Sequence, residues 1–156
     1  MICENAVNTT YGDDMKGSKD LLSSVLKTTQ MGQVGIRCVL KFPLNASLRT
    51  ELRTQLQQYD EIEQEAHSIA SSRGWTLEEL DPAAKVMAGM MTRTRLKFGN
   101  ADSKTAAMMI QGNTRGMIKS LKNMHQFCGS DERVSRLSQK LLDSETANIR
   151  KMQGFV

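Results

Sequence analysis

The sequence predicts an all-α protein, an up-down bundle of four long helices with one long crossover that carries a short extra helix. Three observations predict this fold. Helix-forming residues dominate the 156-residue chain, and aromatic residues make up only 4% of it. Apolar residues recur with a period near 3.6 in four long stretches. Short turns join the first stretch to the second and the third to the fourth, whereas residues 74–102 separate the middle two.

The first two helices are predicted over residues 18–41 and 47–73. Pro43 follows the first helix and cannot continue it. Gly74 follows the second and suits a helix C-cap. The apolar or small positions of the first helix are Leu21, Leu22, Val25, Gly32, Ile36 and Val39. Those of the second are Leu48, Leu52, Leu56, Tyr59, Ile62, Ala66 and Ile69.

The last two helices are predicted over residues 103–127 and 131–155. Gly129 ends the third long helix, and Ser130 or Asp131 caps the fourth. The inward positions are Ala106, Ile110, Met117, Leu121 and Met124 in the third, and Val134, Leu137, Leu141, Ile149 and Met152 in the fourth. Mid-helix glycines at 32, 35, 112 and 116 each cost about 1 kcal/mol relative to alanine, which predicts close approach of helix backbones there.

The crossover contains two helix-start signals. Thr76 and Glu79 have the spacing of a capping box. Asp81 suits an N-cap, and Pro82 suits the first position of a short helix that ends near Phe98.

The chain is predicted to be one domain over residues 18–156, preceded by a flexible N-terminal tail over 1–17. The cysteines at 3, 38 and 128 are odd in number and widely spaced, which argues against a disulfide framework. No apolar run approaches the ~20 residues of a membrane span. The first residues lack the basic and apolar segments of a secretion signal. We therefore expect a cytoplasmic protein without membrane contact.

Two glutamates are predicted to point inward from their helices. With about 100° per residue, Glu63 lies about 40° from Tyr59, the centre of its apolar stripe, and Ala66 lies at about −20°. Glu145 and Asn148 occupy the same two angles around Leu141. His67 falls at the edge of the stripe, while Asp60, Glu61 and Glu65 fall on the solvent face.

The other two long helices have no acid at their inward positions. They offer Thr29 or Gln33 on the first and Asn113 or Thr114 on the third. The predicted buried polar layer therefore consists of Glu63, Glu145, Asn148, Asn113 and Gln33. Its two carboxylates could share a proton, bind a cation or accept hydrogen bonds from the neighbouring amides. A divalent ion such as Fe, Mn or Zn, if bound, would be held by Glu63, His67 and Glu145.

Other candidate motifs are weaker. His125 and Cys128 are three apart on one helix, but no second pair completes a metal site. Core filling explains the methionines at 87, 90, 91, 108 and 109 better than copper binding does. The third long helix carries a basic stripe of Lys104, Arg115, Lys119 and Lys122, without stacking aromatics or a groove-reading motif. Nucleic acid is therefore not the expected partner. Docking of the stripe on the acidic face of a second copy predicts a dimer or larger homo-oligomer.

The stretches "LRTQLQQYDEIEQEAHSIASSRGW", "MMIQGNTRGMIKSLKN" and "LLDSETANIRKM" resemble the ferritin-like superfamily. More narrowly, the chain resembles small ferritin-like and spore-coat-like bundle proteins of Gram-positive bacteria. The resemblance implies inward carboxylates and histidines in metal-binding relatives, and only Glu63 and Glu145 match that pattern here. We expect a non-enzymatic bundle with a degenerate metal layer and a structural or interaction role. The alternative is a metal-binding protein with an atypical or mononuclear site. An association with spores or stress would follow from the resemblance alone.

Overall fold

The computed structural model describes residues 11–127 and 131–156, and within them it contains five helices and no strand. These are α1 (Tyr11–Val39), α2 (Ala46–Arg73), α3 (Pro82–Leu96), α4 (Ala101–Gln126) and α5 (Glu132–Gln153). The all-α prediction is therefore confirmed. In the part of the chain that is described, no helix combines the length and apolar character needed to cross a membrane.

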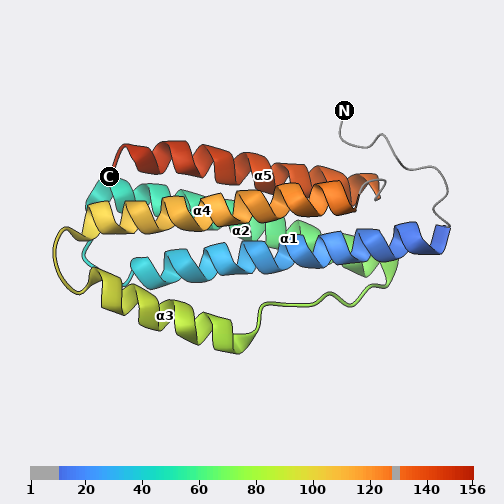
Figure 1. Cartoon of the computed structure of the whole chain (residues 1–156), viewed down its shortest axis with the longest axis horizontal. Coiled ribbons are helices and arrows are strands. Elements are labelled where there is room, and N and C mark those ends of the chain that lie inside the picture. Colours follow the sequence, from blue (N-terminus) through green and yellow to red (C-terminus); the bar gives the residue numbers. More distant parts are fainter. Residues whose placement is uncertain (1–10, 128–130) are drawn as a thin grey trace.

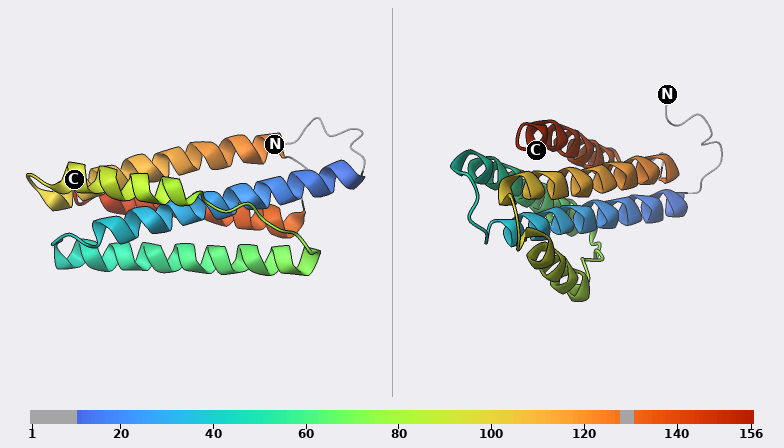
Figure 2. Two further views of the ribbon diagram at one scale, coloured as in Figure 1. Left: turned by 90° about the horizontal axis from the view of Figure 1, so that it is seen from below. Right: turned by 60° about the vertical axis from the view of Figure 1, so that its left-hand side comes forward.

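The four long helices lie side by side, and α3 lies outside them against α1 (Figures 1 and 2). Helices α1 and α2 are antiparallel, as are α4 and α5 (Figure 1). The chain leaves α2 at one end of the molecule and returns through residues 74–100 to enter α4 at the other end. Consequently α2 and α4 run in the same direction.

Local capping chemistry sets several helix ends. Gly74 follows α2 with a φ of 67°, a left-handed conformation that glycine adopts readily. At the start of α3, the Asp81 side chain accepts a hydrogen bond from the Ala83 N–H at 2.8 Å, and Pro82 occupies the first turn. Asp131 caps α5 by accepting from the Arg133 N–H at 2.9 Å. Of the other residues expected at this turn, Gly129 and Ser130 lie outside the described ranges.

The N-terminal boundary differs from the prediction. Helix α1 begins at Tyr11 rather than near Ser18, so the predicted tail over 1–17 is helical in its last part. Residues 1–10 lie outside the described ranges. The other long helices begin and end within two residues of their predicted limits, as expected for termini read from sequence.

The predicted capping box at Thr76 and Glu79 does not start a helix, because residues 75–81 are non-helical. The Glu78 N–H donates to Ser23 Oγ at 3.2 Å, and the Leu80 N–H donates to Gln30 Oε1 at 2.8 Å. Pro82 disfavours helical geometry at the residue before it, so a helix from Thr76 would have had little room to grow. The side chains of α1 satisfy the extended backbone instead.

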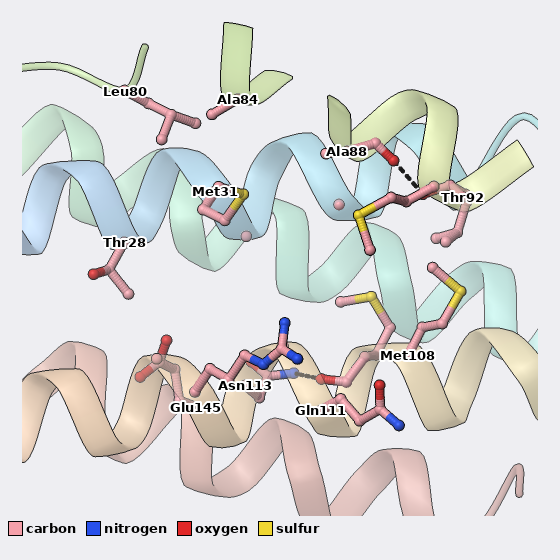
Figure 3. A pocket seen from close by; sticks show the side chains of 18 of the residues that line it. Thr28, Met31, Leu80, Ala84, Ala88, Thr92, Met108, Gln111, Asn113 and Glu145 are labelled. Carbon is pink, nitrogen blue, oxygen red and sulfur yellow. Dashed lines mark hydrogen bonds between the residues drawn. The ribbon is translucent and has the colours of Figure 1, made fainter. Parts of the chain in front are cut away.

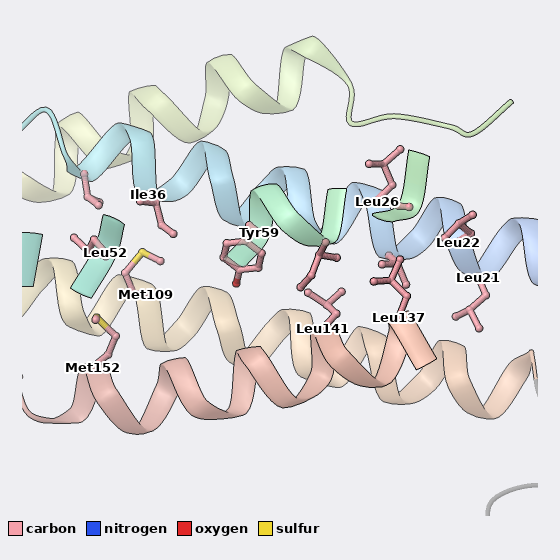
Figure 4. Packing of buried hydrophobic residues seen from close by; sticks show 14 of the residues in the cluster. Leu21, Leu22, Leu26, Ile36, Leu52, Tyr59, Met109, Leu137, Leu141 and Met152 are labelled. Atoms are coloured by element: carbon pink, nitrogen blue, oxygen red, sulfur yellow. The ribbon is translucent and has the colours of Figure 1, made fainter. Parts of the chain in front are cut away.

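One continuous core lies between the four long helices (Figure 4). The labelled core residues are Leu21, Leu22, Leu26, Ile36, Leu52, Tyr59, Met109, Leu137, Leu141 and Met152. In contrast, α3 buries only Thr92 and Leu96. Helix α3 is therefore an outer wall that shields one side of α1 and contributes little to the core.

Candidate functional site

The predicted polar layer is divided into two groups in the structure. The first, the Gln–Glu63 group, consists of Gln30 and Gln33 on α1 with Asp60, Glu63 and His67 on α2. The second, the central polar group, consists of Tyr59 on α2, Asn113 on α4, and Glu145 and Asn148 on α5. Gln33 and Glu63 therefore separate from the other three members of the predicted layer.

In the Gln–Glu63 group, two amides hold one carboxylate. Gln30 Nε2 donates to Glu63 Oε1 at 3.0 Å, and Gln33 Nε2 donates to Glu63 Oε2 at 2.7 Å. Gln33 Nε2 also donates to Asp60 Oδ1 at 2.8 Å. Both glutamines are buried, whereas the Glu63 side chain is 27% exposed. Glu63 therefore lies at the edge of the core, not at its centre as the helical angles suggest.

The surroundings of Glu63 favour its ionised form. Burial raises the pKa of Glu63, but the hydrogen bonds from Gln33 and Gln30 and the charges of His67 and Arg37 outweigh it and hold that pKa below its usual range. Both carboxylate oxygens already accept from amide N–H groups. This arrangement stabilises a carboxylate without a metal ion.

His67 does not reach Glu145. It is exposed, and its Nε2 lies 3.8 Å from Glu63 Oε1 and 3.8 Å from Glu79 Oε1 of the crossover. Such distances on a wet helix face are typical of weak, solvent-screened ion pairs. The predicted metal candidates are thus divided, with Glu63 and His67 on the α2 edge and Glu145 in the interior.

Glu145 is the most unusual residue of the central polar group. It is 2% exposed, and its Oε2 has no hydrogen-bond partner among the described residues. Burial raises the pKa of Glu145 to about 8, although the Ser120 hydroxyl and the Lys119 ammonium lower it in part. The carboxyl is therefore mostly protonated at neutral pH, and it can donate as well as accept a hydrogen bond.

Tyr59 and two asparagines complete the central polar group. The Tyr59 hydroxyl donates to Asn113 Oδ1 at 2.8 Å, and Asn113 Nδ2 donates to the Met109 carbonyl at 2.8 Å. Burial raises the pKa of Tyr59, the charge of Glu145 raises it further, and the nearby Asn148 amide lowers it in part. Asn148 is buried, yet within residues 11–127 and 131–156 its amide makes no hydrogen bond of good geometry. Among the described residues, the side-chain amide of Asn148 and the Oε2 atom of Glu145 are therefore left without hydrogen-bond partners.

The two threonines considered for the layer do not join it. Thr114 donates to the Ile110 carbonyl within α4 at 2.8 Å. Thr29 is fully buried, and its hydroxyl has no partner in the described part of the chain.

The predicted approach of helix backbones is wrong, because side chains are the nearest atoms at two of the four mid-helix glycines and no atom is near the other two. A Cβ atom at Gly32 would lie 2.6 Å from the Tyr59 ring, and one at Gly116 would lie 2.0 Å from Glu145 Oε1. At Gly35 and Gly112 a Cβ would meet no atom within 4 Å. Two glycines therefore make room for central polar residues, and the other two border open space.

That open space is a pocket of about 540 Å³ between α1, α3 and α4 (Figure 3). All four of these glycines line it, and Tyr59, Asn113 and Glu145 reach it from the core side. Glu145 extends past α4, and its carboxyl faces the space between α4 and α1 (Figure 3). The pocket therefore connects the central polar group to the outer wall formed by α3.

Methionines form much of the pocket wall. Met31, Met87, Met91, Met108 and Met109 line it. The prediction that the α3 methionines fill the core is wrong, since Met87, Met90 and Met91 are 63%, 63% and 47% exposed. Helix α3 contacts the bundle along a narrow strip, so most of its apolar residues face the pocket or the exterior.

The basic stripe predicted on the outer face of the third long helix is divided. Arg115 and Lys119 line the pocket, together with Lys27 of α1 and Arg95 of α3. Lys104, in the first turn of α4, instead donates to the carbonyl of Phe98, which precedes that helix. The sequence does not single out Lys27, Arg95 or Gln30, because no inward acid or histidine pattern includes them.

The candidate metal ligands do not converge on one point in the structure. Within the described ranges, no three His, Cys, Asp or Glu side chains group as metal ligands would. Glu63 accepts from amides, and Glu145 faces a glycine and a tyrosine. The weaker His125–Cys128 pair cannot be placed because Cys128 lies outside the described residues.

No protein-family model, curated protein or solved structure matches the chain.

Proposed function

We propose that this protein is a non-enzymatic ferritin-like bundle whose metal layer is degenerate and which has a structural or interaction role. The direction of the helices supports the fold assignment. A crossover that spans the length of the molecule makes α2 and α4 parallel, which is the connection used by ferritin-like bundles.

The separation of the two glutamates carries the functional proposal. In a di-metal bundle the inward carboxylates and histidines converge on one site. Here amides of α1 hold Glu63, whereas Glu145 faces Gly116, Lys119 and Ser120 of α4. The Tyr59 hydroxyl donates to the side-chain amide oxygen of Asn113. An amide oxygen is not a base at neutral pH, so it cannot take the proton from the hydroxyl. These groups suit a polar core better than redox or hydrolytic chemistry.

Thermal unfolding with and without metal tests this proposal. The parent protein, purified without chelator, should melt at the same temperature with a chelator and with added Fe²⁺, Mn²⁺ or Zn²⁺. A ligand that binds only the folded state would raise the melting temperature. A metal-dependent rise in the parent that is lost in both Glu63→Gln and Glu145→Gln would overturn the proposal and favour an atypical metal site. Glu61→Gln, on the exposed face of α2, is the matched control.

We also propose that the protein is cytoplasmic and forms a homo-oligomer. The support for this location and this state is the odd, dispersed set of cysteines and the charged outer faces of α2 and α4. Part of that support weakens in the structure, because Asp60 and Glu65 of the acidic face pair with Arg37 and Lys140 of the same chain.

A further inference from the structure

The pocket has the dimensions of a small-molecule site, which goes beyond the proposed role of the polar layer. Its volume of about 540 Å³ lies within the roughly 300–1,000 Å³ typical of ligand pockets. Such pockets combine mainly apolar walls with a few polar groups that orient the ligand. Here methionines and glycines form the walls, and Glu145, Tyr59 and Asn113 form the polar floor.

The charges around the pocket favour an anion. Four cationic side chains line it, namely Lys27, Arg95, Arg115 and Lys119, against one acid, Glu145. Lys27 is paired with Glu78 of the crossover. Among the described residues, neither Arg115 nor Lys119 makes an ion pair. An anionic group would therefore gain favourable contacts at this rim, whereas an ammonium group would meet like charge.

Lys27, Lys119 and Glu145 form one polar end of the pocket, whereas Arg95, farther along the wall, donates to Gln111 Oε1 at 3.4 Å. Lys27 and Lys119 both line this end. Burial and the positive charge of Lys27 lower the pKa of Lys119, whereas the charge of Glu145 raises it. From Lys27 the wall follows α1 to Val39, a rise of about 18 Å at ~1.5 Å per residue. Met91 and Met108 lie along this apolar stretch. Methionine side chains adapt their shape, so they suit a flexible apolar ligand.

We propose that this pocket binds an amphipathic organic acid such as an alkyl carboxylate. Its anionic group lies at the end formed by Lys27, Lys119 and Glu145. Its apolar body extends between α1, α3 and α4 along the methionines. At neutral pH the protonated Glu145 carboxyl donates a hydrogen bond to the anion, which gives the unpartnered Oε2 a role.

Isothermal titration calorimetry with three matched probes tests the head group. Laurate, dodecanol and dodecylamine share an alkyl chain and differ in charge. We expect laurate to bind most tightly, dodecanol more weakly and dodecylamine weakest. Equal binding of laurate and dodecylamine, or no laurate binding below its micelle concentration, would overturn the proposal.

Two variants locate the site. Lys119→Gln should weaken laurate binding about tenfold, as for loss of one charge-assisted hydrogen bond, and leave dodecanol binding unchanged. Lys122→Gln is the matched control, because Lys122 is on the same helix but does not line the pocket. A laurate affinity that both variants leave unaltered would overturn the assignment of the anionic end.

A third variant fills the pocket. Gly112→Leu adds a side chain where a Cβ meets no atom within 4 Å, so the fold should be retained while laurate and dodecanol binding are both lost. Gly35→Leu makes the same test from α1 if the first variant does not fold. Unchanged laurate binding in a folded variant would overturn the proposal. So would a parent dimer that Gly112→Leu converts to a monomer, because a second copy would then occupy the pocket.

Discussion

The buried carboxyl of Glu145 makes stability depend on pH in a defined direction. Its pKa of about 8 in the folded chain exceeds the ordinary value of 4.5 expected on unfolding. Between these two values the folded state binds more protons than the unfolded state. Stability therefore falls as pH rises, with a limiting slope of about 1.4 kcal/mol per pH unit.

Glu145→Gln should remove that dependence, because the amide is neutral at every pH in this range. Urea unfolding at about pH 5 and about pH 8 measures it: the parent should lose stability between them, and the variant should lose less. Glu61→Gln, on the exposed face of α2, should follow the parent. Parallel pH profiles for the parent and Glu145→Gln would show that this carboxyl does not titrate in the range.

Glu63 should respond differently to substitution. Glu63→Leu removes the acceptor for two buried amides, Gln30 and Gln33. Gln33 keeps its bond to Asp60, but the Gln30 amide loses its partner. We expect a destabilisation of about 1–3 kcal/mol, measured by urea unfolding, as for a buried donor left without an acceptor. A stabilised variant would mean that the hydrogen bonds contribute less than the cost of burying the carboxylate.

The two glutamates also show what helical angles can and cannot predict. Glu63 and Glu145 occupy the same angle from the centres of their stripes, yet only Glu145 is fully buried. The angle describes a helix alone, whereas exposure depends on the size of the neighbouring side chain. Gly116 opposite Glu145 leaves space for it, and Gln30 and Gln33 hold Glu63 at the edge. That pairing could not be inferred before the helices were placed.

At the level of the helix, the glycines of α1 should have opposite effects when replaced. Gly35→Ala should stabilise the protein by about 0.5–1 kcal/mol, because the Cβ meets nothing and alanine favours the helix. Gly32→Ala should destabilise it by about 1–3 kcal/mol, since the Tyr59 ring lies 2.6 Å from the added atom.

Denaturation midpoints of these two variants measure the difference. The substitutions are chemically identical and three residues apart, so helix propensity cancels between them. If both variants were stabilised, the Tyr59 ring would have to move away from α1 without losing its bond to Asn113.

Helix limits were predictable wherever the signal was local. Gly74, the Asp81–Pro82 pair and Asp131 act within one turn, and all three mark helix ends in the structure. Thr76 and Glu79 also have a local signal, but distant Ser23 and Gln30 bind the backbone of that segment. The exposure of the α3 methionines could not be predicted either. Hydrophobic periodicity shows which face of a helix is apolar, but not how much of that face packs against other helices.

At the level of the whole molecule, charged outer faces predict an association that salt weakens. Asp60 and Glu65 are already paired within the chain, Lys104 bonds to the Phe98 carbonyl, and Arg115 and Lys119 line the pocket, which leaves Glu61 and Lys122 of the predicted faces to meet a second copy. We expect a dimer or larger species at low salt that dissociates above about 0.1 M, where exposed charges are screened. Light scattering across a salt series measures this, and a monomer throughout would contradict it.

The all-α architecture and the order of its helices could be predicted from hydrophobic period and turn lengths, because both are properties of short segments. The pocket could not be predicted from the sequence in this way. The sequence shows that four mid-helix glycines lower helix stability, at Gly32, Gly35, Gly112 and Gly116. Only the packed helices show that a neighbouring side chain lies against Gly32 and Gly116. The route of the crossover then decides that open space remains beside the other two.

The narrow attachment of α3 has a consequence for amide hydrogen exchange. Since this helix buries only two of its residues, it can unfold locally while the four long helices stay intact. Its amides should exchange with deuterium well before those in the middle of α1, α2 or α5, as mass spectrometry of peptic fragments would measure. If α3 instead exchanged as slowly as α5, it would belong to the same cooperative unit as the four long helices.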